Sequence, residues 1–337
     1  MFKVAFIGFG GIAHSNHIAP QFELEKEGKT ELVAVCDIRP EVFDQEITIN
    51  IGSGKVSLPD RVKRYTDYKE MLANEQIDIV IICVPTYLHA EISIYALETG
   101  HHVLCEKPMS LRYEDCLKMC KAAKKADKKL MIGQSVRFGD HAKYIKKLVD
   151  DQTYGKVKAA LFQRKSCPPG WAWENWYMDF SRSNGAIMDF HVHDIDFARS
   201  AFGEPKAVSC CTADVYCRKD IVHSRLMYDD FSVMAIADWS REGLPFERYW
   251  QVSFEKGTVQ HLGTELKVCP RGGEPFVVEF ENNSTQKVEL QYLMDWIDGK
   301  VENTFNPPEG SALTIKLVNT LMESSDKNGE FIPFSAE

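Results

Sequence analysis

The chain has 337 residues, enough for two domains of ordinary size, and its 44% hydrophobic and 26% charged content is usual for a protein with a large apolar core. A formal net charge of −9 argues against nucleic-acid binding, which depends on Lys and Arg side chains that neutralise phosphates. No apolar run approaches the roughly 18 residues that span a membrane, and the N-terminus lacks a secretory signal, so we expect no membrane partner and a cytoplasmic location. The ten cysteines include no C-x-x-C pair and are expected to be reduced thiols.

Short apolar runs rich in Val and Ile alternate with longer amphipathic stretches in the first part of the chain. Such runs are typical of strands buried on both faces of a parallel sheet. Helices are expected at 90–100, where Gly100 is a plausible C-cap, and at 111–126, where Ser110 is placed as N-cap. This rhythm predicts a doubly wound α/β unit. The expected strands are 3–8, 31–37, 78–85, 101–108 and 129–138.

The rhythm changes after about residue 150, where strands follow one another without long helices between them. The predicted fold is therefore α/β, with an N-terminal Rossmann dinucleotide-binding domain (1–122) followed by an α+β domain with a large, mostly antiparallel open sheet (123–337). A sheet covered by helices on one face needs cover on the other, so we expect a homodimer or homotetramer that associates through this sheet. The expected elements here are strands 156–165, 207–217, 231–240 and 248–259 and helices 291–300 and 309–325.

The segment GFGGIA (8–13) has the G-x-G-x-x-A pattern of a phosphate-binding turn between a strand and a helix. Gly8 permits the tight turn, Gly10 lets the backbone approach a pyrophosphate, and the helix N-terminus offers free N–H groups. Asp37 ends the next strand, 27 residues after Gly10, and would accept hydrogen bonds from the adenosine ribose. A carboxylate there favours NAD, whereas Arg39 would bind the 2′-phosphate of NADP, so both remain open. The turn also contributes Phe9, Gly11 and Ile12 as cofactor-binding candidates.

The segment MDFHVHDID (188–196) supports two interpretations. With a strand period of two, Asp189, His191 and His193 share a face that resembles a metal site. With a helical period, Asp189, His193 and Asp196 share one polar stripe, and His191 points elsewhere. Gly185 before the segment and Gly203 after it are helix-boundary signals, so we favour the helix and predict no metal.

Five segments together resemble the Gfo/Idh/MocA family of oxidoreductases. They are GFGGIA, CVPTYLHAE (83–91), CEKPMS (105–110), GAIMDFHVHDID (185–196) and EGSALTIKLVNTLMES (309–324), and the resemblance extends over nearly the whole chain. The E-K-P tripeptide after a Rossmann strand, followed about eighty residues later by D-x-x-x-H-x-x-D, is specific. One departure is His191, which stands where glycine is commoner in the family.

This resemblance implies an NAD-dependent oxidoreductase with Lys107 beside the nicotinamide and the reacting hydroxyl. The family's aspartate and histidine fall on Asp189 and His193, and the Lys107–Pro108 peptide is expected to be cis, as it often is in relatives. Other cofactor-binding candidates lie at or after the carboxyl ends of the predicted strands. They are Val84, Pro85, Thr86, His89, Glu106, Pro108 and Gln134.

The implied chemistry is hydride transfer between nicotinamide and a secondary alcohol or ketone of a sugar, polyol or inositol-like substrate. His193 suits the role of base, Lys107 stabilises the alkoxide, and Asp189 orients His193 or holds a neighbouring hydroxyl. Arg137 either binds a substrate carboxylate or phosphate or forms a salt bridge. Trp176, in the aromatic run 171–177, either stacks on a sugar ring or packs the loop down.

Three other functions remain as alternatives. They are a nucleotide-sensing regulatory protein on the same fold, a metal-dependent hydrolase that uses Asp189, His191 and His193, and NAD-assisted glycoside cleavage. His14 and His17, which follow the glycine turn, are interpreted as surface or packing residues.

Overall fold

The computed structural model describes residues 1–49, 52–55, 57–281 and 283–336. The chain forms two compact units. The first contains Met1–Ser135, Trp171–Glu174 and Asn283–Ala312, and the second contains Val136–Gly170, Asn175–Asn282 and Leu313–Glu337. The first unit thus extends beyond the boundary expected at residue 122 and takes in two segments from much later in the chain.

The first unit is built on a six-stranded parallel sheet in the order β5-β2-β1-β6-β7-β8. Its central strands are almost completely buried, as the apolar runs in the sequence predict. The order reverses between β1 and β6, which creates a switch point at the carboxyl ends of those two strands. The strands are β1 (Phe2–Ile7), β2 (Thr30–Cys36), β5 (Lys63–Tyr65), β6 (Ile79–Ile82), β7 (His102–Glu106) and β8 (Leu130–Gly133); β3 (Glu46–Ile49) and β4 (Gly52–Lys55) form a separate hairpin.

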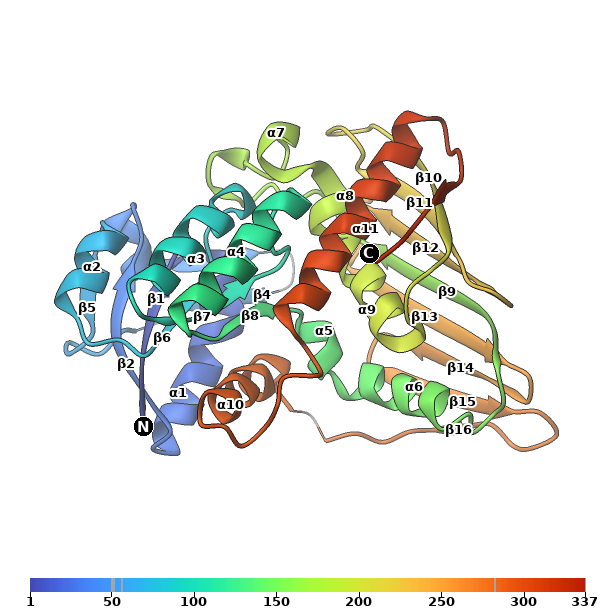
Figure 1. Ribbon diagram of the computed structural model, residues 1–337, viewed down its shortest axis with the longest axis horizontal. Coiled ribbons are helices and arrows are strands. Elements are labelled where there is room, and N and C mark those ends of the chain that lie inside the picture. The colour runs from blue at the N-terminus through green and yellow to red at the C-terminus, as the bar shows by residue number, and fades with distance from the viewer. Residues whose placement is uncertain (50–51, 56, 282, 337) are drawn as a thin grey trace. The chain divides into compact units, whose positions relative to one another are not determined.

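Helices cover this parallel sheet. Helices α3 and α4 pack on each other, with α3 against β6 and β7, while α1 packs on β2 and on α10 (Figure 1). Ser110 does not cap α4 as expected, because Arg112, in an extended conformation, precedes the first helical turn. The bounds are η1 (Ala13–His17), α1 (Ile18–Lys26), η2 (Pro40–Phe43), α2 (Tyr68–Asn74), η3 (Thr86–Leu88), α3 (His89–Glu98), α4 (Tyr113–Ala126) and α10 (Thr285–Ile297).

The second unit contains a nine-stranded sheet in the order β16-β15-β14-β13-β9-β12-β11-β10-β17. Only the β9–β12 pair is parallel among the described strands. The predicted fold class is therefore confirmed, although the single strand expected at 248–259 is a hairpin. The strands are β9 (Val157–Lys165), β10 (Ala207–Ala213), β11 (Ile221–Met227), β12 (Ser232–Asp238), β13 (Glu247–Phe254), β14 (Gly257–Leu262), β15 (Glu265–Pro270), β16 (Phe276–Val277) and β17 (Ile332–Pro333).

One face of the large sheet carries the helices of the second unit. Helix α9 contacts β9 and β12, and α6 packs on α9 (Figure 1). The core between them is aromatic: the ring of Phe197 lies 5.3 Å from Phe162 and 4.5 Å from Trp250. The remaining helices are α5 (Ser135–Phe138), where the expected strand 129–138 ends early, α6 (Asp140–Asp150), η4 (Trp173–Asn175), α7 (Phe180–Ser183), α8 (Gly185–Asp189), α9 (Val192–Phe202) and α11 (Pro308–Asp326). Most of η4 and the first residues of α11 belong to the first unit.

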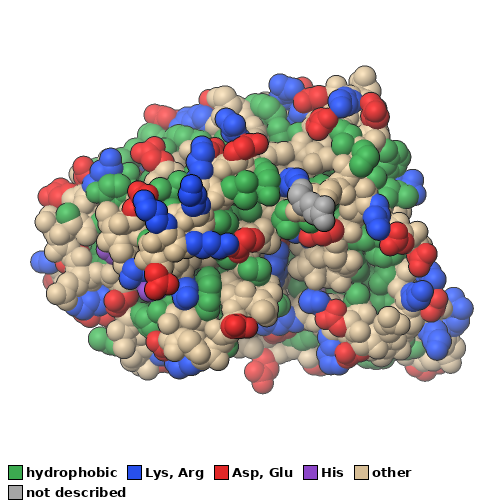
Figure 2. Space-filling model, viewed as in Figure 1, with side chains coloured by type: hydrophobic (Ala, Val, Ile, Leu, Met, Phe, Trp, Pro, Cys, Tyr) green, Lys and Arg blue, Asp and Glu red, His purple; other side chains and the backbone are tan. Residues whose placement is uncertain are grey.

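The charged side chains on the face drawn in Figure 2 are of both signs and interspersed. None of the helices in the described parts of the chain is long and apolar enough to cross a membrane.

Candidate active site

The glycine turn lies at the switch point of the parallel sheet. Gly8 has a φ of 83°, and a Cβ added to it would lie 2.6 Å from the carbonyl carbon and oxygen of Cys83. Only glycine therefore fits between the end of β1 and the end of β6. The chain then enters η1, whose first turns are wound as a π-helix before α1 begins. The first glycine of the predicted phosphate-binding turn thus makes the tight turn that its pattern requires.

Asp37 closes the turn from the neighbouring strand. Its Oδ2 accepts a hydrogen bond from the Phe9 N–H at 2.9 Å, and its Oδ1 accepts from the backbone N–H and the Nε of Arg39 at 3.0 and 3.2 Å. The Asp37 side chain is 7% exposed, and that of Arg39 is 27% exposed. A carboxylate and a cation, the two groups that the sequence assigns to a ribose and to a 2′-phosphate, therefore lie side by side.

Glu106, at the end of β7, is bound from two sides. Its Oε1 lies 2.7 Å from Nε2 of His17, and its Oε2 accepts the backbone N–H of Lys107 at 3.0 Å. Burial raises the pKa of Glu106, but the hydrogen bond and charge of His17 outweigh it, so that pKa is below its usual value. His17 was expected to be a surface or packing residue; it is 3% exposed and forms part of the site. No sequence signal links it to Glu106, because 89 residues separate them.

The Lys107–Pro108 peptide is cis, as the family resemblance implies. His89 holds this loop from the other side: its Nδ1 lies 2.8 Å from the Pro108 carbonyl oxygen and its Nε2 lies 2.9 Å from that of Val84. Burial lowers the pKa of His89, although both carbonyl oxygens favour its protonated form. In this structure the imidazole joins the ends of β6 and β7, so its direct contacts are with the loop on which Lys107 lies.

The polar groups at this edge of the sheet fit a bound dinucleotide. Gln134 follows β8 and is 1% exposed, yet its Nε2 has no hydrogen-bond partner among the described residues. A buried donor without a partner is costly, and a ligand acceptor would satisfy it. Thr86, also buried, begins the short helix after Val84 and Pro85. Together with the glycine turn, these residues could hold the phosphates and the nicotinamide half of NAD.

The segment 188–196 is helical, which confirms the period of 3.6 residues. The helix is broken, however: α8 ends at Asp189 and α9 begins at Val192. Asp189 is buried at 7% exposure, and His193, on the first turn of α9, is partly exposed. His191 is fully buried and its Nε2 lies 2.7 Å from Oγ of Ser224 on β11, while burial lowers its pKa to about 4. It therefore packs against the sheet.

Two further acids of this segment are held in buried ion pairs. Asp196, expected in the polar stripe with His193, accepts bonds from Nε and Nη2 of Arg137, both at 2.7 Å. It also accepts the hydroxyl of Thr314. Of the two interpretations of Arg137, the structure therefore supports the salt bridge. Both partners belong to the second unit. Asp194 is bound in the same way by Arg164 at 2.9 Å.

The aromatic run 171–177 divides into two parts. Trp176 is 7% exposed and stacks on Tyr177 with ring centres 3.8 Å apart, and Tyr177 meets Trp239 edge-on. This burial favours the packing interpretation of Trp176 over sugar stacking. Trp173 instead lies against Arg39 in the first unit, with its ring centre 5.7 Å from the guanidinium carbon.

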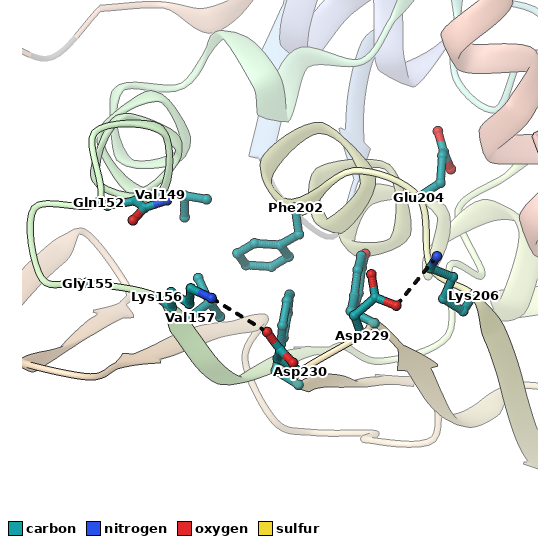
Figure 3. Close-up of a pocket in the computed structure, with 12 residues that line it drawn as sticks. Val149, Gln152, Gly155, Lys156, Val157, Phe202, Glu204, Lys206, Asp229 and Asp230 are labelled. Carbon is teal, nitrogen blue, oxygen red and sulfur yellow. Dashed lines mark ion pairs between the residues drawn. The ribbon is translucent and has the colours of Figure 1, made fainter.

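No group of three or more His, Cys, Asp or Glu side chains among the described residues is arranged to hold a metal ion. One pocket of the second unit, about 360 Å³ in volume, lies beyond the end of α9 (Figure 3). Phe202, Tyr228 and Phe231 form its aromatic wall, and the pairs Lys156–Asp230 and Lys206–Asp229 lie at 3.9 and 3.5 Å. It contains none of the predicted site residues.

Two family models match this chain. One, described as an oxidoreductase family with an NAD-binding Rossmann fold, matches residues 2–134, and the other, the GFO/IDH/MocA C-terminal domain, matches residues 142–260. Together they cover well over half of the chain.

Among curated relatives, myo-inositol 2-dehydrogenase of Thermotoga maritima is 35% identical over 206 residues, which are 60% of this chain and 55% of that protein. The 2,7-anhydro-N-acetylneuraminate hydratase of Mediterraneibacter gnavus is 26% identical over 248 residues, 70% of this chain and 66% of that protein. The chain thus spans between about half and two thirds of these relatives.

The fold is shared over a greater length. The aldose–aldose oxidoreductase of Caulobacter crescentus, solved with glycerol, superposes with a TM-score of 0.83 at 22% identity and covers 99% of both chains. The switch-point glycine turn, the parallel sheet and the two family matches agree. The chain belongs to the GFO/IDH/MocA oxidoreductase family, and its first unit is the NAD-binding Rossmann domain of that family.

Proposed function

We propose that this protein is an NAD-dependent dehydrogenase that acts on a secondary alcohol, or the corresponding ketone, of a sugar, polyol or inositol-like substrate. The observation that carries this proposal is the double support of the Lys107 loop. The Glu106 carboxylate accepts the Lys107 backbone N–H, and His89 lies against the Pro108 carbonyl oxygen. A lysine held this firmly at the cofactor edge of a Rossmann sheet suits catalysis better than a solvated strand end does.

Each proposed role follows from the chemistry of the side chain. Nicotinamide, when bound, accepts the hydride. The Lys107 ammonium stabilises the negative charge that develops on the substrate oxygen. His193 takes the hydroxyl proton, because an imidazole titrates close to neutral pH. Asp189, at the end of α8, orients the imidazole or binds a neighbouring hydroxyl.

The substrate class is supported by the names of the relatives, which include an inositol dehydrogenase and an oxidoreductase of aldoses. Polyols and sugars present adjacent hydroxyl groups, and an acid beside a base is suited to hold one hydroxyl while another reacts. Among the cofactors, we propose NAD rather than NADP, because the Asp37 carboxylate repels a 2′-phosphate. The Arg39 guanidinium, which could attract that phosphate, is already paired with Asp37.

A second function is transient oxidation, in which the cofactor is reduced and reoxidised within one turnover. The similarity to a 2,7-anhydro-N-acetylneuraminate hydratase favours this alternative. Lys107 and His193 would have the same roles in this alternative, because both reactions begin with removal of a hydride and a proton from the substrate. Transient oxidation differs in its outcome, because it converts the sugar without accumulating NADH.

The test is turnover on a panel of inositols, sugars and anhydro sugars. NADH is followed by absorbance and sugar conversion by chromatography. We expect Lys107→Ala and His193→Ala each to lower kcat/KM by at least about a hundredfold, the usual scale for loss of an acid–base or oxyanion-stabilising group. Lys118→Ala, on an exposed lysine of α4, is the matched control and should leave turnover unchanged.

Two results would count against the proposal. If the wild type binds NADH but both variants keep full turnover on an accepted substrate, the roles of Lys107 and His193 are wrong. If the wild type binds NADH and converts nothing in the panel, by either assay, the nucleotide-sensing alternative is favoured.

A further inference from the structure

Residues 171–174, which we call the tryptophan strap, belong to the first unit although the chain on both sides of them belongs to the second. The strap contains the start of η4. After it, the chain does not return to the first unit until Asn283. The side chains of these four residues therefore pack with the first unit, whereas the residues before and after them pack with the second.

The strap contacts the residues that follow β2. The guanidinium carbon of Arg39 lies 5.7 Å from the centre of the Trp173 ring. The same guanidinium donates to Asp37 through Nε at 3.2 Å, and its Nη2 lies 3.4 Å from the position that a Cβ on Gly10 would occupy. Trp173 is therefore joined through one side chain to both the ribose-binding carboxylate and the glycine turn.

The groups gathered here suit a purine nucleoside. Ile38, between Asp37 and Arg39, is 64% exposed, which is unusual for an apolar residue that follows a buried strand. An indole ring, a guanidinium plane and an apolar side chain are the surfaces on which a purine base stacks. Asp37 supplies the acceptor that the attached ribose requires.

The backbone at the end of the strap is also unusual. Glu174 and Asn175 have φ values of 49° and 50°, so two consecutive residues other than glycine adopt the left-handed conformation. Such a conformation is unfavourable for side-chain-bearing residues and persists where the surrounding structure enforces it. The chain returns to the second unit at this point, between Glu174 and Asn175.

We propose that Trp173 is a cofactor-binding residue that contacts the adenosine half of the dinucleotide. The proposal rests on NAD binding by the first unit. It adds a binding residue that comes from the second half of the chain and that no phosphate-binding pattern includes.

The experiment measures the binding of cofactor fragments by calorimetry. ADP-ribose contains the adenosine half of NAD, and nicotinamide mononucleotide contains the other half. We expect Trp173→Ala to weaken ADP-ribose and NADH binding by about tenfold, the usual effect of removing an aromatic ring from a stacked base, and to leave nicotinamide mononucleotide binding unchanged. Trp173→Phe keeps an aromatic face and should restore most of the affinity.

The matched control is Trp296→Ala. Trp296 also lies against a cation in the first unit, with Lys129 Nζ 5.2 Å from its ring centre, and it lines a different pocket. This variant should bind ADP-ribose like the wild type. Thermal unfolding of both variants shows that each is folded.

Hydrogen exchange provides a second readout that does not depend on a variant. ADP-ribose should slow amide exchange in residues 171–174 of the wild-type protein. If Trp173→Ala binds ADP-ribose as tightly as the wild type, or if ADP-ribose binds without slowing exchange in the strap, the proposal is wrong. NAD binding itself is tested separately, because the wild type either binds NADH in these titrations or does not.

Discussion

Glu289 on α10 is a carboxyl group in an unfavourable place. Its side chain is fully buried, and neither of its oxygens has a hydrogen-bond partner among the described residues. Burial, and then the charge of Glu106, raise the pKa of Glu289 well above its ordinary value of 4.5. Glu106 keeps its negative charge because His17 lies against it. The pair therefore consists of one ionised and one neutral acid, and only the ionised one holds the Lys107 loop.

Replacement of Glu289 by Gln should make the protein more stable at high pH. The folded state retains the Glu289 proton, whereas the unfolded state loses it above about pH 4.5, so stability falls as pH rises from that value to the folded pKa. The loss is at most about 1.4 kcal/mol per pH unit. Glu289→Gln removes it. We expect similar midpoints of urea unfolding at pH 4.5 and a higher midpoint for the variant at pH 8.

The control for this prediction is Glu114→Gln, since Glu114 is 64% exposed on α4. Its unfolding midpoint should follow the wild type at every pH. Equal pH dependence in Glu289→Gln and the wild type would show that Glu289 is ionised in the folded protein.

Arg39 should determine how well the protein tolerates NADP. The guanidinium is the cation beside Asp37 and can form charge-assisted hydrogen bonds with a 2′-phosphate. We expect the wild type to bind NADH more tightly than NADPH, and Arg39→Ala to weaken NADPH binding about tenfold and NADH binding less. Fluorescence titration measures both, with Arg112→Ala, on a 71% exposed arginine, as control. Loss of NADH affinity as large as that of NADPH would contradict the assignment.

At this scale the sequence reveals residues that belong to a local motif. Gly8, Asp37 and Lys107 are recognisable as candidates because each proposed role depends on neighbours a few positions away or on a fixed spacing. The partner of an ionised group cannot be recognised in this way. Arg137 and Asp196 are 59 residues apart, and their ion pair depends on how α5 and α9 pack. Periodicity placed Asp196 on the polar stripe correctly but could not show that the stripe was already neutralised.

Among the elements, the broken helix of residues 185–202 matters most for the site. The backbone N–H of His191 bonds to the Ala186 carbonyl oxygen at 2.8 Å, one residue further back than in an α-helix. The chain is thus turned between α8 and α9, and Asp189 and His193 lie on separate helices. A hydrophobic period of 3.6 predicts the helix but not the break, because both halves keep the same buried face.

The loop after β7 depends on His89, at the start of α3. Replacement by Ala removes two contacts to carbonyl oxygens and leaves a cavity, so we expect a loss of about 2–3 kcal/mol in unfolding free energy. Because Lys107 then loses its fixed position, kcat should fall about tenfold or more. Urea unfolding and steady-state kinetics measure the two effects.

The matched control is His101→Ala. His101 is also buried, and its Nδ1 lies 3.1 Å from the Ala96 carbonyl oxygen at the other end of α3. It should lose stability without losing kcat. If His89→Ala is destabilised but turns over at the wild-type rate, the loop does not depend on this histidine.

The strands show which patterns can be read in advance. The buried strands of the parallel sheet were predicted because uninterrupted Val and Ile runs leave few alternatives. The segment 248–259 was predicted as one strand because its turn, at Glu255 and Lys256, contains neither Asn-Gly nor Asp-Gly. β11 was missed, since its outward residues His223 and Arg225 interrupt the apolar run.

On the scale of the whole molecule, the large sheet of the second unit has one face on which none of its own described helices packs. Val233, Ala235 and Ala237 of β12 are buried beneath the helices, while Met234 faces the other way and is 40% exposed. Arg225 of β11 pairs with Met234 in register. We propose that a second copy of the chain covers this face, because the helices that contact β9 and β12 pack on the other face and leave Met234 exposed.

Met234→Glu should therefore shift the protein toward monomers, since it places a charge in the centre of that contact. Light scattering coupled to size-exclusion chromatography measures the mass. Leu117→Glu, on a 46% exposed leucine of α4, is the control and should leave the mass unchanged. A monomeric wild type, or an unaltered oligomer in Met234→Glu, would contradict the proposal.

The two-part organisation was predictable in order but not in detail. The change from alternating helices and strands to successive strands marks two folds along the sequence. It does not show that residues 283–312 return to the first unit, or that residues 171–174 visit it. Both depend on contacts between segments more than a hundred residues apart, and a pattern within one segment contains no information about them.

The most direct measurement of the central claim is the transfer of a labelled hydride. The protein is incubated with NAD⁺ and a panel of sugars and polyols that carry deuterium on their carbinol carbons, and the cofactor is analysed by mass spectrometry. We predict that deuterium from an accepted substrate appears in the reduced cofactor, which is sampled by rapid quenching during turnover if oxidation is transient, and that Lys107→Ala slows the transfer at least about a hundredfold. NAD⁺ binding with no label in the cofactor from any member of the panel would contradict the proposed hydride transfer to these substrates.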